Sequence, residues 1–496
     1  MTPTRILLAA LLASAAACAP PPVAGPAPLA APPRTAIAAA LDSIFDTPAF
    51  ASAHWGVLVR SAETGETLYA RNPGKMFVPA SNVKLVTASA ALQGLGPEYR
   101  YRTAIVAAGP VRGGALEGDL VVVGSGDPTV SARFAGDPRA VLRAWADSLR
   151  ARGVTRISGR VLGDDDVFDE RALGRGWAWD DVDAAYSAEI SGLPFDEGSA
   201  ALRVEPGAEA GSAARVSLAP ATAYLRLAAD VATGAPESER RVRVERGADP
   251  REIRVSGSIP AGGEALEQRV SVPDNTAYFA AVLRETLAEA GIAVGGDAAE
   301  AQAGWGAGRT VDTLFVHRSP PLREILPGFM KPSQNQIGEI LLKTLGAELR
   351  GMGTAGAGIV VVDSLFRMRG LPTGLLSQAD GSGLSRYNLA APELLVLLLE
   401  GERGGPHFAV YADALPVAGV DGTLAGRMGD TPLQANVRAK TGTLSGVRAL
   451  SGYLATAEGE PLVFSMLVNH HTLTARDADR LAEAALMRLY ALPRGR

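Results

Sequence analysis

The 496-residue sequence contains a single cysteine, 5% aromatic residues and no excess of positive charge. One cysteine leaves no partner for a disulfide within the chain, so packing alone must hold the fold together. The net charge of −5 provides no basic surface, and no Lys/Arg cluster with interleaved aromatic residues occurs. We therefore do not expect a nucleic-acid partner.

Lysine is also scarce. Five of the 48 basic residues are lysines and the other 43 are arginines, which stay protonated at any relevant pH. A desolvated lysine can lose its proton and act as a base. Because this chain uses arginine for surface charge, Lys84 and Lys440, which lie in short motifs with serine, threonine and glycine, are the first candidates for a functional site.

The first 18 residues have the pattern of an export signal: a positive residue, a short apolar run and a zone of small residues. The apolar run is too short to span a membrane as a helix. Cys18 follows directly and resembles the lipidated cysteine of bacterial lipoproteins. Cleavage after Ala15 or Ala17, with Cys18 as an incidental thiol, is the alternative. Both interpretations predict a periplasmic protein, and lipidation of Cys18 would also attach it to the membrane.

The length of the chain exceeds what one hydrophobic core supports, so several domains are expected. Residues 19–34, rich in proline and alanine, are predicted to be a flexible tether. Residues 35–100 and 311–492 are predicted to form one discontinuous catalytic domain. Between them, residues 101–310 alternate short valine-rich strands with turn residues, which predicts an inserted, mainly β region of one or two modules.

Strand patterns lie at both ends of the predicted catalytic domain. A hairpin is predicted over 55–70 and three strands within 437–468, with mostly helical sequence between them. This order predicts an α+β fold, an α/β sandwich in which one antiparallel sheet built from both ends of the chain is flanked by helices.

Ser81 and Lys84 lie three residues apart at the start of a predicted buried helix. Positions i and i+3 share a helix face, so the amine can reach the hydroxyl and activate it as a nucleophile. A backbone N–H at a helix N-terminus can also stabilise a developing oxyanion. Without other motifs, a capping serine and a surface lysine would explain this spacing equally well.

Two further motifs contain candidate site residues. Ser333 and Asn335 form a Ser-x-Asn sequence at a predicted helix start, where such residues usually act as caps. The run Lys440-Thr441-Gly442-Thr443 lies on a predicted strand, where a lysine is unusual except at an edge. Its ammonium and hydroxyls could hold a carboxylate, Gly442 would let a ligand backbone approach, and the Thr443 N–H could complete an oxyanion hole.

Taken in order, these motifs resemble the Ser-x-x-Lys, Ser-x-Asn and Lys-Thr-Gly set of penicillin-binding proteins and serine β-lactamases. The long insertion between the first two is similar to that of class C low-molecular-mass penicillin-binding proteins, the D-alanyl-D-alanine carboxypeptidases and endopeptidases. Further matches extend along almost the whole chain, at residues 79–81, 118–120, 126–129, 176–181, 380–386 and 419–424.

The resemblance implies a serine D,D-peptidase that acts on peptidoglycan stem peptides, is acylated by β-lactam antibiotics and needs no cofactor or metal. In that scheme Ser81 attacks and Lys84 is the base. Ser333 relays a proton to the leaving amine, and Asn335 orients the peptide or Lys84. Lys440 with Thr441 binds the terminal carboxylate.

Two residues are assigned by the resemblance to substrate specificity. Asp181 and Arg386 match family positions that hold the free end of a diaminopimelate side chain, and ordinary surface charges are the alternative explanation.

The sequence fits other functions less well. The five histidines show no metal-ligand spacing. No Gly-x-Ser-x-Gly sequence of a Ser-His-Asp hydrolase occurs. A serine β-lactamase shares the three motifs but has a much shorter chain between the first two. A cell-wall-binding lipoprotein without turnover would not need all the motif residues. The balance of carboxypeptidase and endopeptidase activity stays open at this point.

Overall fold

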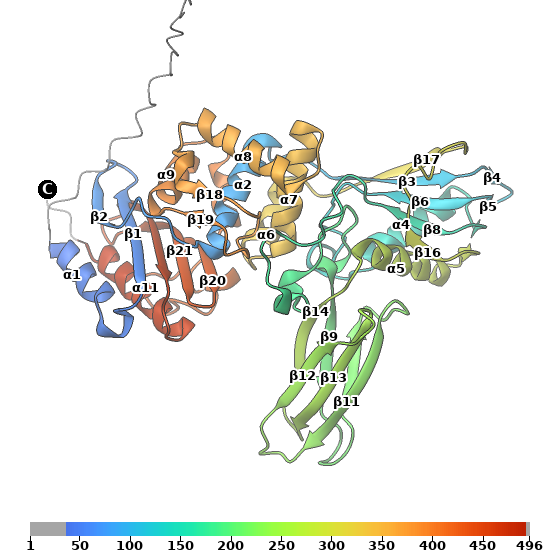
Figure 1. The fold of residues 1–496 in the computed structure, drawn as a ribbon, viewed down its shortest axis with the longest axis horizontal. Coiled ribbons are helices and arrows are strands. Elements are labelled where there is room, and N and C mark those ends of the chain that lie inside the picture. Colours follow the sequence, from blue (N-terminus) through green and yellow to red (C-terminus); the bar gives the residue numbers. More distant parts are fainter. Residues whose placement is uncertain (1–35, 493–496) are drawn as a thin grey trace, which may run out of the picture. The chain divides into compact units, whose positions relative to one another are not determined.

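The computed structural model describes residues 36–492; the predicted export signal, Cys18 and the tether lie outside them. A five-stranded antiparallel sheet has the order β2-β1-β22-β21-β20 (Figure 1). Its strands are β1 (His54–Ser61), β2 (Thr67–Arg71), β20 (Arg438–Leu444), β21 (Val447–Ala455) and β22 (Pro461–Asn469). The predicted sheet from both ends of the chain is confirmed.

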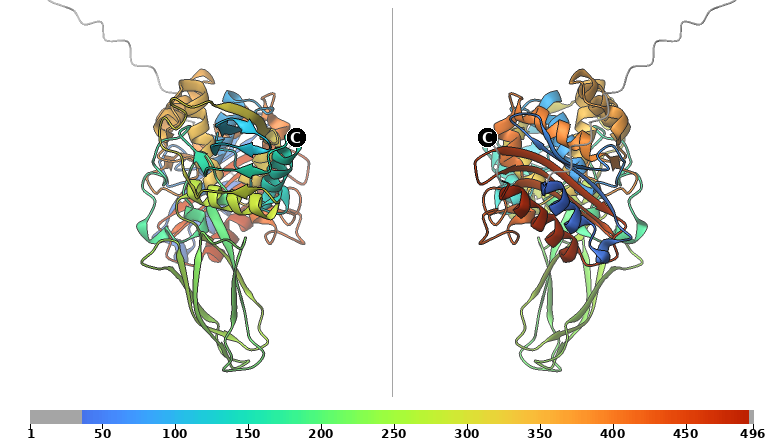
Figure 2. Two further views of the ribbon diagram at one scale, coloured as in Figure 1. Left: turned by 90° about the vertical axis from the view of Figure 1, so that its right-hand side faces the viewer. Right: turned by 90° about the vertical axis from the view of Figure 1, so that its left-hand side faces the viewer.

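Helices cover both faces of this sheet. On one face, α1 (Ala36–Phe45) packs against α11 (Ala475–Tyr490), and Figure 2 shows the two helices lying across the strands. On the other, α9 (Pro392–Arg403) contacts β1 and β22. Because neither face meets solvent, eight of the nine residues of β22 are buried, where a half-exposed strand would alternate.

A group of helices lies beside the sheet. It contains α2 (Val83–Gly94), α6 (Leu322–Met330), α7 (Asn335–Arg350), α8 (Ala355–Met368) and α10 (Phe408–Ala414). All but α10 were predicted, since α10 has only seven residues and shows little periodicity. Thr354 caps α8 by accepting the Ala357 N–H, which separates α8 from α7.

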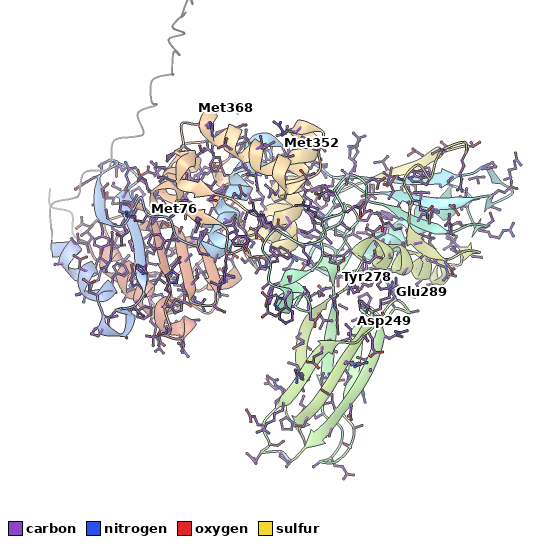
Figure 3. The ribbon with its side chains drawn as sticks, viewed as in Figure 1. Met76, Asp249, Tyr278, Glu289, Met352 and Met368 are labelled. Carbon is purple, nitrogen blue, oxygen red and sulfur yellow. The ribbon has the colours of Figure 1, made fainter. Side chains whose placement is uncertain are left out.

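Within residues 36–492 no single helix is long and apolar enough to cross a membrane; α7 and α8 meet the criterion only as a pair bent by 75°. Two exposed methionines belong to this pair: Met352 lies in the link between α7 and α8, and Met368 ends α8 (Figure 3).

The sequence between α2 and α6 contains four small sheets and three helices, of which α3 (Ala132–Ala135) is a single turn. One sheet has the order β16-β8-β6-β3-β17 and a second has the order β15-β7-β5-β4. The bounds are β3 (Arg102–Ala108), β4 (Val111–Arg112), β5 (Ala115–Leu116), β6 (Asp119–Val123), β7 (Arg156–Ile157), β8 (Val161–Asp164), β15 (Ala293–Val294), β16 (Ala298–Glu300) and β17 (Asp312–Arg318). Helices α4 (Ala140–Ala151) and α5 (Asn275–Glu289) pack together, with Trp145 and Phe279 in a common core.

Two three-stranded sheets follow within the same stretch, with the orders β10-β9-β14 and β11-β13-β12. Their strands are β9 (Ser199–Glu205), β10 (Arg215–Ala219), β11 (Arg226–Gly234), β12 (Arg241–Arg246), β13 (Glu252–Pro260) and β14 (Leu266–Ser271). We propose that these sheets are a second module within an inserted domain, and that residues 35–100 and the sequence after β17 form the catalytic domain. The predicted limits of the insertion, 101–310, are extended because β17 (Asp312–Arg318) pairs with β3.

Candidate active site

Ser81 lies in a turn of 3-10 helix (Ala80–Asn82) that leads directly into α2. Ala80 has a φ of 47°, a conformation that costs a non-glycine residue about 1–3 kcal/mol and persists only where its surroundings impose it. Those surroundings include the sheet: Asn82 Nδ2 donates to Ser451 Oγ on β21 at 2.7 Å, and Ser451 Oγ donates to Ser465 Oγ on β22 at 2.8 Å. The turn is therefore fixed to the sheet.

Lys84 is fully buried on the first turn of α2. Its Nζ lies 3.0 Å from Ser81 Oγ, 2.6 Å from Asn335 Oδ1 and 2.6 Å from the Ser382 carbonyl oxygen. The i, i+3 contact that the sequence predicts is thus present. The amine has three oxygen neighbours, one of which is the hydroxyl of Ser81.

Burial lowers the pKa of Lys84 to about 7, and the negative charges of Asp380 and Glu339 limit this decrease. An ordinary lysine, with a pKa near 10.4, would be almost wholly protonated at neutral pH. Lys84 therefore supplies a substantial fraction of neutral amine at physiological pH.

Ser333 and Asn335 lie at the junction of α6 and α7, and both line the same pocket as Ser81. Ser333 has a φ of 64°. Asn335 accepts from Lys84 and donates through Nδ2 to the carbonyl of Tyr186 at 2.8 Å. The helix is capped by neither motif residue but by Gln334, whose side-chain oxygen accepts the Ile337 N–H at 3.0 Å. Because Gln334 caps α7, the side chains of Ser333 and Asn335 are not needed as caps.

Lys440 lies on β20, which is an edge strand of the sheet. Its side chain is fully covered, and Nζ donates to the carbonyl of Thr441 at 3.0 Å. Burial, together with the positive charge of Lys84, holds the pKa of Lys440 well below its usual range. Within residues 36–492 no ion pair to Lys440 is formed, so an anion bound nearby would be stabilising.

The pocket beside these residues has a volume of about 460 Å³. Its lining residues are Ser81, Gly176, Ala178, Asp181, Tyr186, Ser333, Asn335, Gly383, Leu384, Arg386, Thr423, Thr441, Thr443, Leu444 and Ser445. Neither lysine of the motifs lines it, since both are fully buried. Thr423 and Thr441 do line it, and their hydroxyls lie 2.6 Å apart.

The position that a side chain of residue 442 would occupy is already filled by the protein itself. A Cβ at this position would lie 2.7 Å from the carbonyl oxygen of Pro79 and 3.2 Å from Ala80 Cβ. On this side the missing side chain makes room for the serine turn of the protein itself, and close approach of a ligand backbone stays a prediction.

Asp181 and Arg386 both reach the pocket, from different loops. Tyr186 donates its hydroxyl to Asp181 Oδ1 at 2.5 Å, and Arg386 Nη2 donates to the Ser445 carbonyl at 2.7 Å. The loop of Asp181 belongs to the predicted insertion, so inserted sequence contributes directly to the pocket.

A third lysine near the site, Lys331, has no role assigned from the sequence. It forms an ion pair with Asp421, and its carbonyl accepts the Thr423 N–H at 2.9 Å. Asp421 and Thr423 belong to the segment 419–424, which matches the family motif. Lys331 therefore fixes the loop that brings Thr423 to the pocket.

A serine at the start of a buried helix, a lysine within reach of its hydroxyl, and an antiparallel sheet whose edge strand borders the pocket together define a class. It is the class of active-site serine hydrolases that comprises the D,D-peptidases and the serine β-lactamases. A Ser-His-Asp arrangement is not needed to activate this serine.

Comparison with known proteins narrows the class. The chain belongs to the D-Ala-D-Ala carboxypeptidase 3 (S13) family, whose model matches residues 37–489. It is 39% identical over 465 residues to a D-alanyl-D-alanine carboxypeptidase of Actinomadura sp. (strain R39), covering 90% of this chain and 84% of that relative. The family and this relative make the chain a serine D,D-peptidase of the class C low-molecular-mass penicillin-binding type, as the sequence predicted.

Solved structures agree on the fold. Penicillin binding protein 4 from Haemophilus influenzae superposes with a TM-score of 0.78 at 25% identity, over 92% of this chain and 99% of that one. The same protein complexed with a novel β-lactam superposes with a TM-score of 0.73 at 24% identity, over 92% and 100% of the two chains. The serine D,D-peptidase fold expected from the sequence is confirmed.

Proposed function

We propose that Ser81 is the nucleophile of an acyl-enzyme mechanism and that Lys84 is its general base. One observation carries this assignment: the buried amine has Asn335 Oδ1 and the Ser382 carbonyl as acceptors for two N–H bonds, and the Ser81 hydroxyl as its third neighbour. A neutral amine has two N–H bonds and one lone pair. With both N–H bonds occupied, the lone pair is directed at the proton of Ser81.

The first half of the reaction then follows from the positions of these groups. Ser81 Oγ attacks the carbonyl carbon between two D-residues while its proton passes to Lys84. The N–H groups of Ser81 and Thr443 stabilise the oxyanion of the tetrahedral intermediate. The C–N bond breaks, and Ser333 relays the proton to the departing amine, either D-alanine or a cross-linked D-residue. Water later hydrolyses the ester and regenerates Ser81.

Substrate recognition is assigned to residues on both sides of the serine. The terminal carboxylate binds at the Thr441 hydroxyl, above the positive potential of Lys440. Because a bound carboxylate stabilises the ammonium, it raises the depressed pKa of Lys440. Asp181 and Arg386, which carry opposite charges at the pocket wall, hold the amino and carboxylate groups at the free end of a diaminopimelate side chain.

We further propose a periplasmic location, with Cys18 lipidated and the tether of residues 19–34 linking the enzyme to the membrane. Peptidoglycan stem peptides are the substrates, and β-lactams acylate Ser81 in their place. The complex of the Haemophilus protein with a β-lactam supports the second statement.

Labelling with a fluorescent penicillin tests the assignment. Label is expected on the peptide that contains Ser81, and Ser81→Ala should abolish it while leaving the melting temperature close to that of the wild type. Retained label in Ser81→Ala would move the nucleophile elsewhere. Label that disappears within seconds would instead favour a β-lactamase. Digestion of cross-linked muropeptides, with products counted, then separates carboxypeptidase from endopeptidase activity, and binding without any release of D-alanine would favour a non-catalytic wall-binding protein.

A further inference from the structure

Glu339 is a buried glutamate that the mechanism above does not use. It lies on α7, one helical turn after Asn335, and its side chain is 1% exposed. Both of its carboxylate oxygens accept the Gly381 N–H at 3.0 Å, and Oε1 also accepts the Ser382 N–H at 2.9 Å. A fully buried carboxylate is costly unless a specific set of donors surrounds it. Here the donors are two consecutive peptide groups of one loop.

The same loop contacts the base. The carbonyl of Ser382 accepts an N–H of Lys84 at 2.6 Å, and the carbonyl of Gly381 accepts the Thr87 hydroxyl at 2.7 Å. The loop is also pressed against α7, because a Cβ on Gly381 would lie 2.2 Å from the Gly338 carbonyl oxygen. Glu339 thus holds the N–H side of this loop while α2 holds its carbonyl side.

We propose that Glu339 is a positioning residue for the base: it anchors the Gly381–Ser382 loop so that the Ser382 carbonyl takes one N–H of Lys84 and the lone pair of the amine faces Ser81. This inference rests on the proposed function, in which Lys84 is the base. Without a fixed acceptor at Ser382, Asn335 Oδ1 would be the one remaining acceptor, apart from Ser81 itself, for the N–H bonds of the amine. The amine could then rotate its lone pair away from the serine proton.

Charge gives Glu339 a second, measurable effect on Lys84. Three charged groups face the amine: Glu339 from α7, Asp380 from the loop and Lys440 from β20. The negative charges of Glu339 and Asp380 raise the pKa of Lys84 against the effect of burial. Burial and Asp380 in turn raise the pKa of Glu339, but the N–H groups that its oxygens accept from the loop and the charge of Lys84 favour the carboxylate and oppose this increase. A neutral residue at 339 therefore lowers the pKa of Lys84.

The test is the rate of penicillin acylation as a function of pH. Glu339→Gln keeps the shape of the side chain but replaces one acceptor oxygen with an NH2 group that meets a backbone N–H. We expect the plateau rate to fall by about 10- to 100-fold, the loss expected for a misplaced catalytic group. The acidic limb of the profile, where the rate falls as Lys84 becomes protonated, should also move to lower pH. Glu339→Asp, which keeps the charge, should leave the acidic limb near its wild-type position and lower only the plateau.

The chain offers a matched control. Glu402 on α9 is also fully buried, and its Oε1 accepts from Arg369 and Ser89, both at 2.6 Å. It is not among the charges that shift the pKa of Lys84. Glu402→Gln should lower the melting temperature without moving the acidic limb.

Three outcomes separate the alternatives. A Glu339→Gln profile that matches that of Glu402→Gln refutes the proposal and leaves Glu339 with a purely structural role. If Glu339→Gln does not fold, Glu339→Asp decides, since an unchanged plateau there refutes positioning. If the assignment of Ser81 as nucleophile and Lys84 as base is itself wrong, the result differs, because the wild type would then lack label on Ser81 or lack an acidic limb.

Discussion

The substitution Gly442→Ala tests whether acylation depends on the close contact between β20 and the turn that contains Ser81. In Gly442→Ala the new Cβ would lie 2.7 Å from the Pro79 carbonyl oxygen and 2.9 Å from Ala449 Cβ. Ordinary contact begins near 3.4 Å, so β20 and the turn must separate by about 0.7 Å. The carbonyl belongs to the backbone, which cannot swing away as a flexible side chain can.

This displacement acts on the chemistry because β20 carries Thr441 and Thr443 while the turn carries Ser81. A misplacement of about 1 Å can cost about 100-fold in rate, so we expect penicillin acylation to slow by about 10- to 100-fold. Overpacking should also cost about 1–3 kcal/mol of stability.

The assay is the second-order rate of labelling by fluorescent penicillin, measured alongside the melting temperature. Gly374→Ala is the control: its Cβ would meet nothing within 4 Å, and it lies outside the pocket lining. A folded Gly442→Ala that is labelled as fast as the wild type would refute the reasoning. A lower melting temperature with normal labelling would limit Gly442 to a role in stability.

Two further predictions concern the base, Lys84, and the two pocket residues assigned to substrate specificity, Asp181 and Arg386. Because only the neutral amine can take the serine proton and the pKa of Lys84 is lowered to about 7, wild-type acylation should be constant above that pH and fall about tenfold per pH unit below it; a rate that stays constant well below that pH would contradict the assignment. Asp181→Asn and Arg386→Ala should reduce hydrolysis of peptides with a free-ended diaminopimelate side chain, yet leave labelling by penicillin nearly unchanged. Equal losses for a short peptide ending in D-Ala-D-Ala would assign both residues to general folding of the pocket.

The sequence predicted those parts of the site that depend on local geometry. Ser81 and Lys84 are three residues apart on a helix, and that spacing alone brings amine and hydroxyl together. The lysine within a strand pattern indicated that β20 is an edge strand, as the structure shows. The order of strands at the two chain ends predicted the central sheet, because each strand was long and strongly patterned.

Features that depend on tertiary contacts were not accessible in this way. Glu339 follows Asn335 by four residues and so shares its helix face, a signal that could have been used, but nothing in the sequence marks that face as buried against residues 381–382. Parallel pairs such as β5 with β7 escaped prediction because each of these strands has only two residues. The sequence singles out Gly442, but the approach of the Pro79 backbone to it could be known only from the fold.

The scarcity of lysine also acquires a physical reason. At Lys84 a single nitrogen lies within 3.0 Å of three oxygens, whereas a guanidinium is larger, planar and always protonated and so could not act as a base there. Lys343 is likewise buried, with two carbonyl acceptors, those of Asp169 and Arg171, and the Asp169 carboxylate at 2.7 Å. Arginine carries most of the remaining positive charge, including the partly exposed pairs of the predicted insertion. Three of the five lysines are thus buried with oxygen atoms around the amine, at Lys84, Lys343 and Lys440. Of these three, only Lys84 has a serine hydroxyl among those oxygens.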